Sequence, residues 1–179
     1  MISLFIDTHQ NTNLAIFKDK KLLKYLSSDN PKQSTIIMPL LQEILNDQSI
    51  EINDVSEVIV VNGPGSFTGV RLGVTIAKTI AYCNNISIKC IDSLTLKAIF
   101  DDFKNNVYAL RDTKGAYVGY FNLEKNELTY KNLDEYKELN CKIDVDYNIG
   151  NLYKYEKLFV EKNPHYVNPL YIKKIEAQK

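Results

Sequence analysis

The most informative segment of the chain is Asn62-Gly63-Pro64-Gly65-Ser66-Phe67-Thr68-Gly69-Val70-Arg71. The apolar, β-branched run at 57–61 predicts a buried strand before it, and a helix is expected from about residue 70 to residue 84. A strand, a glycine-rich loop and a helix N-terminus can present backbone N–H groups to an anion. The spacing matches neither a P-loop nor the dinucleotide fingerprint, so phosphate binding and a tight turn remain alternatives. We expect Phe67 to fill a core site.

The helix after this loop carries more apolar surface than one core contact needs. Gly73, Ala77 and Ala81 recur every four residues and form a stripe along which another helix could approach closely. A second apolar set follows the same helix: Leu72, Ile76, Ile80 and Cys83. We predict that part of this surface faces a partner protein. The alternative is that both sets are buried within the chain.

The segment 33–47 predicts an earlier helix, with Ser34 as its N-cap and Pro39 near its start. Its apolar residues wrap round more than one face, as in the helix after the glycine loop, and they are Ile36, Ile37, Met38, Leu40, Leu41, Ile44 and Leu45. Met38 is of a type that adapts to irregular interfaces. Two such helices could build a helical interface with another subunit.

The remaining pattern predicts a duplicated α/β architecture. Strands are expected at 2–7, 14–18 and 21–26 with Asp19-Lys20 in a turn, then at 86–91, before a short helix that Ser93 caps and that ends at Phe100. After the polar segment 101–106, three strands recur at 107–110, 116–123 and 127–130, with Lys125-Asn126 in a turn. Asp7-Thr8 and Asp112-Thr113 end corresponding strands. This layout is that of the actin-like ATPase (ASKHA, ribonuclease-H-like) superfamily, with lobes at 1–100 and a reduced 101–179.

Composition excludes several classes of protein. Lys plus Arg and Asp plus Glu are both 22, so the total charge does not favour direct binding of nucleic acid. No apolar run is long enough for a membrane span and no signal peptide is recognisable, which favours a cytoplasmic protein without membrane contact. Cys83, Cys90 and Cys141 have no C-x-x-C spacing, so we expect free thiols.

The signature Asn62–Gly73, followed by Ala77-Lys78, closely resembles that of the TsaB family, formerly called YeaZ. Shorter matches lie elsewhere in the chain: Ile6-Asp7-Thr8, Gln33-Ser34, Met38-Pro39-Leu40, Asp92-Ser93-Leu94 and Pro169-Leu170-Tyr171-Ile172. Two departures are Gln33, where many members carry His, and Arg111-Asp112-Thr113-Lys114, which follows the family's Asp-Ala-Arg segment only roughly. The resemblance is strong to residue 98 and weaker after it.

The resemblance implies an ASKHA fold that has lost its own catalysis and serves as a scaffold and activator for a paralogue, the threonylcarbamoyl transferase TsaD. The pair modifies the adenosine 3′ of the tRNA anticodon, the small ATPase TsaE also docks on it, and tRNA is reached only through the complex. Family members often self-associate when alone, so a homodimer is left open. No cofactor is expected on this chain alone, with ATP or ADP admitted only in the complex.

The resemblance also implies site residues. The partner-binding helices would contribute Ile37, Met38, Leu41, Val70, Gly73, Val74, Ala77, Lys78 and Ala81. The signature loop comprises Asn62, Gly63, Pro64, Gly65, Ser66, Phe67, Thr68, Gly69 and Arg71. Asp7 and Thr8 would mark a degenerate nucleotide cleft.

Two enzymatic alternatives remain. An active nucleotide-dependent ATPase or kinase would use Asp7 and Asp112 to place Mg²⁺ and the glycine loop to hold phosphate. An M22-type peptidase is less favoured, because His9 and His165 stand outside any recognisable catalytic motif. The same two histidines are far apart in the sequence, so no metal site is expected.

Overall fold

The computed structural model describes residues 1–121 and 126–173. Two sheets and the helices around them make up this part of the chain. The strands are β1 (Ile2–Asp7), β2 (Thr12–Lys18), β3 (Lys21–Ser28), β4 (Val55–Val61), β5 (Ile88–Ile91), β6 (Val107–Asp112), β7 (Gly115–Phe121), β8 (Asn126–Asn132) and β9 (Val160–Lys162). The α-helices are α1 (Gln33–Asp47), α2 (Phe67–Cys83), α3 (Ser93–Phe100) and α4 (Leu133–Lys137), and the 3₁₀ segments are η1 (Ile52–Asp54), η2 (Ile149–Leu158) and η3 (Pro164–Tyr166).

The first sheet has six strands in the order β3-β2-β1-β4-β5-β9. Its centre is parallel, because β4 pairs with β1 on one side and with β5 on the other in the same direction. The hairpin β2-β3 and the short β9 complete the two sides as antiparallel strands. As predicted, Asp19 and Lys20 form the hairpin turn, and both adopt positive φ angles.

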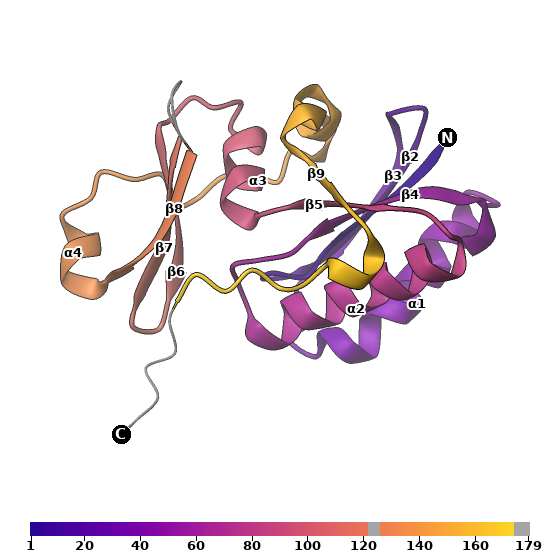
Figure 1. Ribbon diagram of the computed structural model, residues 1–179, viewed down its shortest axis with the longest axis horizontal. Coiled ribbons are helices and arrows are strands. Elements are labelled where there is room, and N and C mark those ends of the chain that lie inside the picture. The colour runs from indigo at the N-terminus through magenta and orange to yellow at the C-terminus, as the bar shows by residue number, and fades with distance from the viewer. Residues whose placement is uncertain (122–125, 174–179) are drawn as a thin grey trace.

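Both faces of this sheet are covered, which explains the continuous apolar runs in its central strands. Because side chains alternate along a strand, Leu4 and Ile6 pack with α1 and α2, whereas Phe5 packs with α3 and η2. Figure 1 shows α1 and α2 side by side on one face of the sheet. The sheet is therefore the middle layer of a three-layer lobe.

Three helix starts differ from the sequence prediction. Helix α2 begins at Phe67, three residues before the expected position, because the Ser66 hydroxyl accepts a hydrogen bond from the Gly69 N–H. The cap of α3 is Asp92 and not Ser93, since the Asp92 carboxylate accepts from two backbone N–H groups. Ser34 lies inside α1, whose N-cap is Lys32 without a side-chain hydrogen bond.

The second sheet is a three-stranded antiparallel meander in the order β6-β7-β8. In its core, Tyr108, Leu110 and Phe121 pack against Leu94 and Ala98 of α3. Helix α3 therefore packs on both sheets, and Figure 1 shows it between them. The strand expected at 116–123 ends at Phe121 in the described chain. Part of that prediction, and Lys125 of the predicted turn, lie outside the described residues, while Asn126 is the first residue of β8.

The chain then returns to the first sheet. Residues of η2 pack with α3 on the second face of the first sheet, where Leu152 is fully buried. Strand β9 then pairs with β5. The rings of Phe100, at the end of α3, and Tyr147, just before η2, have centroids 4.5 Å apart. The division into 1–100 and 101–179 stays a prediction, but much of its second segment packs against the first sheet.

Among the described residues, no helix is both long enough and apolar enough to cross a membrane.

We predict that Leu152→Ala will lower the free energy of unfolding by about 2–5 kcal/mol, because it removes a buried side chain that fills space between η2 and the sheet. Urea denaturation followed by circular dichroism measures this change. Leu23→Ala, at a side chain of β3 that is 40 % exposed, is the matched control and should change stability by less than about 0.5 kcal/mol. Equal effects of the two substitutions would contradict the packing of η2 on this sheet.

Candidate partner-binding surface

The glycines around the start of α2 are required by the turn that follows β1. A Cβ atom on Gly65 would lie 2.5 Å from the His9 carbonyl oxygen, one on Gly69 2.2 Å from the Thr8 carbonyl oxygen, and one on Gly73 2.3 Å from Thr8 Oγ1. These distances are shorter than van der Waals contact, so no larger residue fits without movement. The regular spacing therefore reflects a close approach of the signature loop and the start of α2 to Thr8 and His9.

Hydrogen bonds fix this approach. The Thr8 hydroxyl donates to the Gly69 carbonyl at 2.6 Å, and the Ser66 N–H donates to the His9 carbonyl at 2.7 Å. The Gly69 N–H is already taken by the Ser66 hydroxyl. Of the two alternatives for the glycine loop, the geometry favours a crowded turn over a phosphate cradle, because loop amides are used within the chain.

Asp7 lies at the centre of this turn and is fully buried. Its Oδ1 accepts from the backbone N–H of His9 at 3.0 Å and from His9 Nδ1 at 2.7 Å, and its Oδ2 accepts from the Tyr147 hydroxyl at 2.7 Å. Burial by itself raises the pKa of Asp7, but the charge and hydrogen bonds of His9, with that of Tyr147, outweigh it and hold the pKa below its usual value. Both carboxylate oxygens are therefore occupied by protein donors.

The second aspartate of the predicted nucleotide cleft is also engaged. Asp112 accepts from the Tyr130 hydroxyl and from the Lys173 amine, each at 3.0 Å. Among residues 1–121 and 126–173, no group of three or more His, Cys, Asp or Glu side chains could hold a metal ion. Asp7, Thr8 and Asp112 thus sit where the sequence placed them, at strand ends, but they serve internal contacts.

The polar residues of the signature hold the C-terminal segment 164–172, which we call the strap. The Asn62 carbonyl accepts from the Leu170 N–H at 2.7 Å, and the Lys78 amine donates to the Val167 carbonyl at 3.0 Å. Arg71 Nε donates to the Tyr171 hydroxyl at 2.8 Å. These contacts explain why the signature and the Pro169–Ile172 motif occur together, although a hundred residues separate them.

The predicted interface side chains are mostly in the core. Those of the two helices that are buried within the chain are Ile37, Leu41, Val70, Gly73, Val74, Ala77 and Ala81. Only Met38, which is 55 % exposed, and Lys78, which binds the strap, reach the surface. The Gly73, Ala77 and Ala81 stripe is buried and lets α2 pack closely on its own sheet, so the structure supports the alternative of burial within the chain, and contact of the stripe with a partner stays a prediction. A charged side chain at Ala77 would unfold the chain and could not test an interface.

The position of Phe67 also differs from the sequence prediction. The side chain is 54 % exposed and does not fill the core. The Arg71 guanidinium stacks over its ring at 3.7 Å from the centroid, and Tyr171 of the strap lies 6.0 Å from it. Phe67 therefore marks the exposed end of α2, where the strap passes.

The layer of α1 and α2 exposes a surface of apolar and polar side chains, which we call the helix face. Its exposed members are Met38 of α1 and Thr75 and Thr79 of α2, and its partly exposed members are Leu72 and Ile76 of α2. Leu72 and Ile76 pack against the core on one side and meet solvent on the other. Met38, Leu72 and Ile76 belong to the apolar sets that the sequence places on these two helices, and their contact with a partner stays a prediction.

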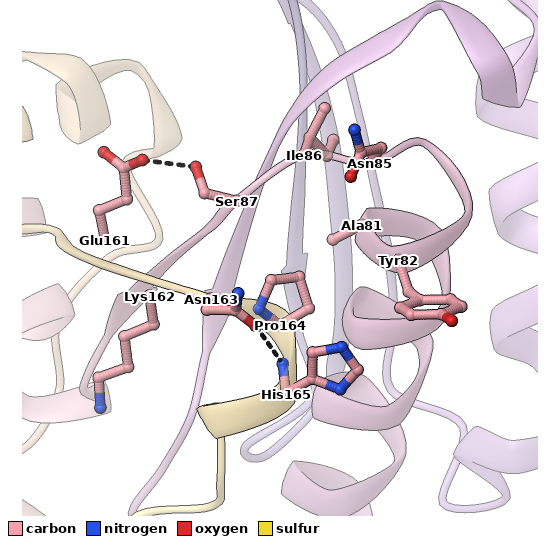
Figure 2. A pocket seen from close by; sticks show the side chains of 10 residues that line it. All are labelled: Ala81, Tyr82, Asn85, Ile86, Ser87, Glu161, Lys162, Asn163, Pro164 and His165. Atoms are coloured by element: carbon pink, nitrogen blue, oxygen red, sulfur yellow. Dashed lines mark hydrogen bonds between the residues drawn. The ribbon is translucent and has the colours of Figure 1, made fainter.

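The hollow in Figure 2 lies at the other end of α2 from the signature loop, between Tyr82 and η3. Its volume is about 850 Å³. Ser87 donates a hydrogen bond to Glu161, and the His165 N–H donates to Asn163 Oδ1. These contacts tie the start of β5 to β9 and shape the turn into η3, so the groups shown in Figure 2 act in the fold.

Comparisons with known proteins identify the family of this chain. A family model described as TsaD, tRNA N6-adenosine threonylcarbamoyltransferase, matches residues 30–134. Over 121 residues the chain is 37 % identical to the tRNA threonylcarbamoyladenosine biosynthesis protein TsaB of Bacillus subtilis, a match that covers 66 % of this chain and 53 % of that protein. The chain belongs to this family, in its TsaB/YeaZ branch. It spans about half the length of the curated TsaB relatives that it matches.

Solved structures share the fold of this TsaB/YeaZ chain. YeaZ from Pseudomonas aeruginosa superposes with a TM-score of 0.72 at 13 % identity, covering 95 % of this chain and 100 % of that one. A protein of the same organism described as similar to peptidase YEAZ gives a TM-score of 0.75 at 12 % identity, covering 96 % and 99 %. The predicted α/β fold class is confirmed. An uncharacterized protein of Mycoplasma pneumoniae, the MG208 homolog, is 27 % identical over 95 % of this chain and 94 % of its own length.

We predict that Gly73→Ala will destabilise the TsaB/YeaZ chain by about 1–3 kcal/mol, because the new methyl group would overlap Thr8 Oγ1. Ordinarily, replacing glycine by alanine inside a helix is stabilising by about 0.5–1 kcal/mol. Thermal and urea unfolding measure the sign of the change. Thr75→Ala, at an exposed position of the same helix, should have little effect, and a stabilising Gly73→Ala would refute the close approach.

Proposed function

We propose that this chain is a scaffold and activating subunit of a tRNA N6-threonylcarbamoyladenosine transferase complex. Its partner would be a TsaD-like catalytic subunit, with a TsaE-like ATPase docking on the pair. Transfer of threonylcarbamoyl to the adenosine 3′ of the anticodon would take place on the partner. The observation that carries the proposal is the match to the TsaD family model, together with relatives named for this biosynthesis.

A non-catalytic role is supported by the state of the predicted cleft. A magnesium-dependent nucleotide enzyme needs carboxylate oxygens that are free to bind the ion or its water. Asp7 offers none, because His9 and Tyr147 occupy both oxygens, and Asp112 is paired with Lys173. The ATPase or kinase alternative therefore lacks a site in the described residues, and we propose no cofactor on this chain alone.

The peptidase alternative has no supporting geometry either. His9 binds Asp7 inside the β1–β2 turn, whereas the His165 ring lies 5.4 Å from the Tyr82 ring at the far end of α2. A hydrolytic triad needs a nucleophile within hydrogen-bond reach of its histidine. His9 Nε2 has no hydrogen-bond partner among residues 1–121 and 126–173, so no serine hydroxyl is held there.

The helix face supports a protein partner. Partly exposed Leu72 and Ile76 of α2 and exposed Met38 of α1 give apolar surface on two neighbouring helices, and Thr75 and Thr79 are also exposed on α2. Interface centres are depleted in charged residues and tolerate such mixed surfaces. Equal numbers of acidic and basic residues in the chain fit contact with tRNA through the complex only. We expect this assembly in the cytoplasm, and whether the chain pairs with itself when alone stays open.

The test combines binding with a cellular readout. Met38→Arg and Thr75→Arg place long charged side chains on the helix face, and each should weaken co-purification with the cognate TsaD-like subunit at least about tenfold, because an unpaired charge would be buried. Both positions are exposed, so the melting temperature of the isolated variants should stay close to that of the parent. Leu23→Arg, on the β2–β3 hairpin, is the control and should bind normally.

Depletion of the protein should lower threonylcarbamoyladenosine in bulk tRNA, and the helix-face variants should fail to restore it. Normal binding by both variants would reject the helix face as the interface. Unchanged threonylcarbamoyladenosine after depletion would reject the function itself.

A further inference from the structure

Arg71 is one of two arginines in the chain, and its side chain is exposed on α2. Residues that are four positions apart lie on the same side of a helix. Phe67, Arg71 and Thr75 therefore form one row along α2, and Thr75 is a member of the helix face. Arg71 thus lies at the edge of that face, next to the signature loop.

Two aromatic rings hold the Arg71 guanidinium in place. Its central carbon lies 3.7 Å from the centroid of the Phe67 ring and 5.8 Å from that of the Tyr171 ring. Nε donates a hydrogen bond to the Tyr171 hydroxyl at 2.8 Å. A side chain that is already held loses less conformational entropy when it binds a partner. Arg71 is therefore ordered before a complex forms.

The held guanidinium has unused hydrogen-bond donors. An arginine side chain carries five N–H groups in one plane, and here the Nε–H is bound to Tyr171. Among residues 1–121 and 126–173, Arg71 forms no ion pair with a carboxylate. Its two Nη atoms can together bind both oxygens of one carboxylate from another molecule.

The chain around Arg71 contains no acidic residue. Between residues 58 and 91 the charged side chains are Arg71, Lys78 and Lys89, and the strap contains no Asp, Glu, Lys or Arg. The whole chain has equal numbers of acidic and basic residues, so its acidic residues are concentrated elsewhere. A carboxylate that approaches Arg71 meets no like charge on α2 or the strap, and such charge complementarity favours an acidic partner.

The lysines near this surface are engaged within the chain. Lys89 pairs with Glu57, Lys173 pairs with Asp112, and Lys78 donates to the Val167 carbonyl. A protein that binds an RNA backbone neutralises several phosphates at once, which these lysines do not favour.

The composition of the site favours a protein partner. Phe67 is 54 % exposed and Tyr171 is 55 % exposed, so both rings flank Arg71 at the surface. Aromatic residues and arginine are enriched in protein interfaces, and tyrosine and arginine often carry much of the binding free energy.

We propose that Arg71 binds an Asp or Glu side chain of the TsaD-like partner. Both carboxylate oxygens would accept hydrogen bonds from the Nη atoms, while Phe67 and Tyr171 act as positioning residues. The inference rests on the proposed function, because the partner is the same, and it adds a charged contact to the helix face. The complex would exclude water from this ion pair, so loss of either member should weaken binding strongly.

Titration calorimetry with the cognate TsaD-like subunit tests the contact. Arg71→Gln should weaken binding about 30-fold or more, because the partner's carboxylate would be buried without its counter-charge. Arg71→Lys keeps the charge but not the two Nη atoms, so it should recover only part of the affinity. Arg111→Gln is the matched control, because Arg111 is also exposed and also donates to a tyrosine hydroxyl, and it should bind like the parent chain.

Two further measurements separate an ion pair from a structural role. Because Arg71 is exposed, isolated Arg71→Gln should melt close to the temperature of the parent chain. Raising NaCl from about 50 mM to about 300 mM should weaken binding of the parent and of Arg111→Gln more than binding of Arg71→Gln, which lacks the screened pair. An equal salt dependence of all three would contradict the ion pair.

The outcomes distinguish this inference from the proposed function. If Met38→Arg blocks binding while Arg71→Gln binds like the parent, the carboxylate contact is rejected and the scaffold role stands. Full affinity of Arg71→Lys would reject the two-atom contact. If Arg71→Gln binds the partner normally but the complex loses affinity for tRNA, Arg71 binds a phosphate and the inference is overturned. If the parent chain does not bind the TsaD-like subunit, the proposed function fails and this inference fails with it.

Discussion

The hydrogen bond from the Thr8 hydroxyl to the Gly69 carbonyl marks the contact on which the remaining structure depends. At this point the end of β1 meets the first turn of α2, with room for nothing larger than glycine on the helix. Gln33 of α1 joins the same point, because its amide donates to the carbonyls of Thr8 and Gln10. One turn of chain thus positions both helices that cover this face of the sheet.

The same turn also sets the position of the second lobe. Tyr147, which enters the first lobe after the β6–β8 meander, donates to the Asp7 carboxylate. A buried carboxylate is costly unless every oxygen is satisfied, so Asp7 requires both His9 and Tyr147. The requirement explains why this aspartate, at the end of β1, organises protein contacts.

The sequence predicted the order of elements well and the exposure of their side chains poorly. Strands β1 to β5 and helices α1 to α3 lie where hydrophobic periodicity placed them, because central strands and core-facing helices leave strong patterns. The stripe of Gly73, Ala77 and Ala81 was ambiguous, since a close approach to a sheet and one to a partner helix require the same small residues. Phe67 was misjudged because nothing local indicates that Arg71 and Tyr171 flank its ring. The return of β9 and the strap depends on pairings across more than seventy residues, which no local signal encodes.

The adjacency of Phe100 and Tyr147 has a topological consequence. The chain leaves the first lobe after one of these residues and re-enters it at the other, and their rings touch. The β6–β8 meander is thus an insertion within a continuous body made from residues 1–100 and 147–172. The chain leaves this body for the meander and returns to it at the same place. Insertions of this kind can lengthen, shrink or diverge without moving the body that carries them.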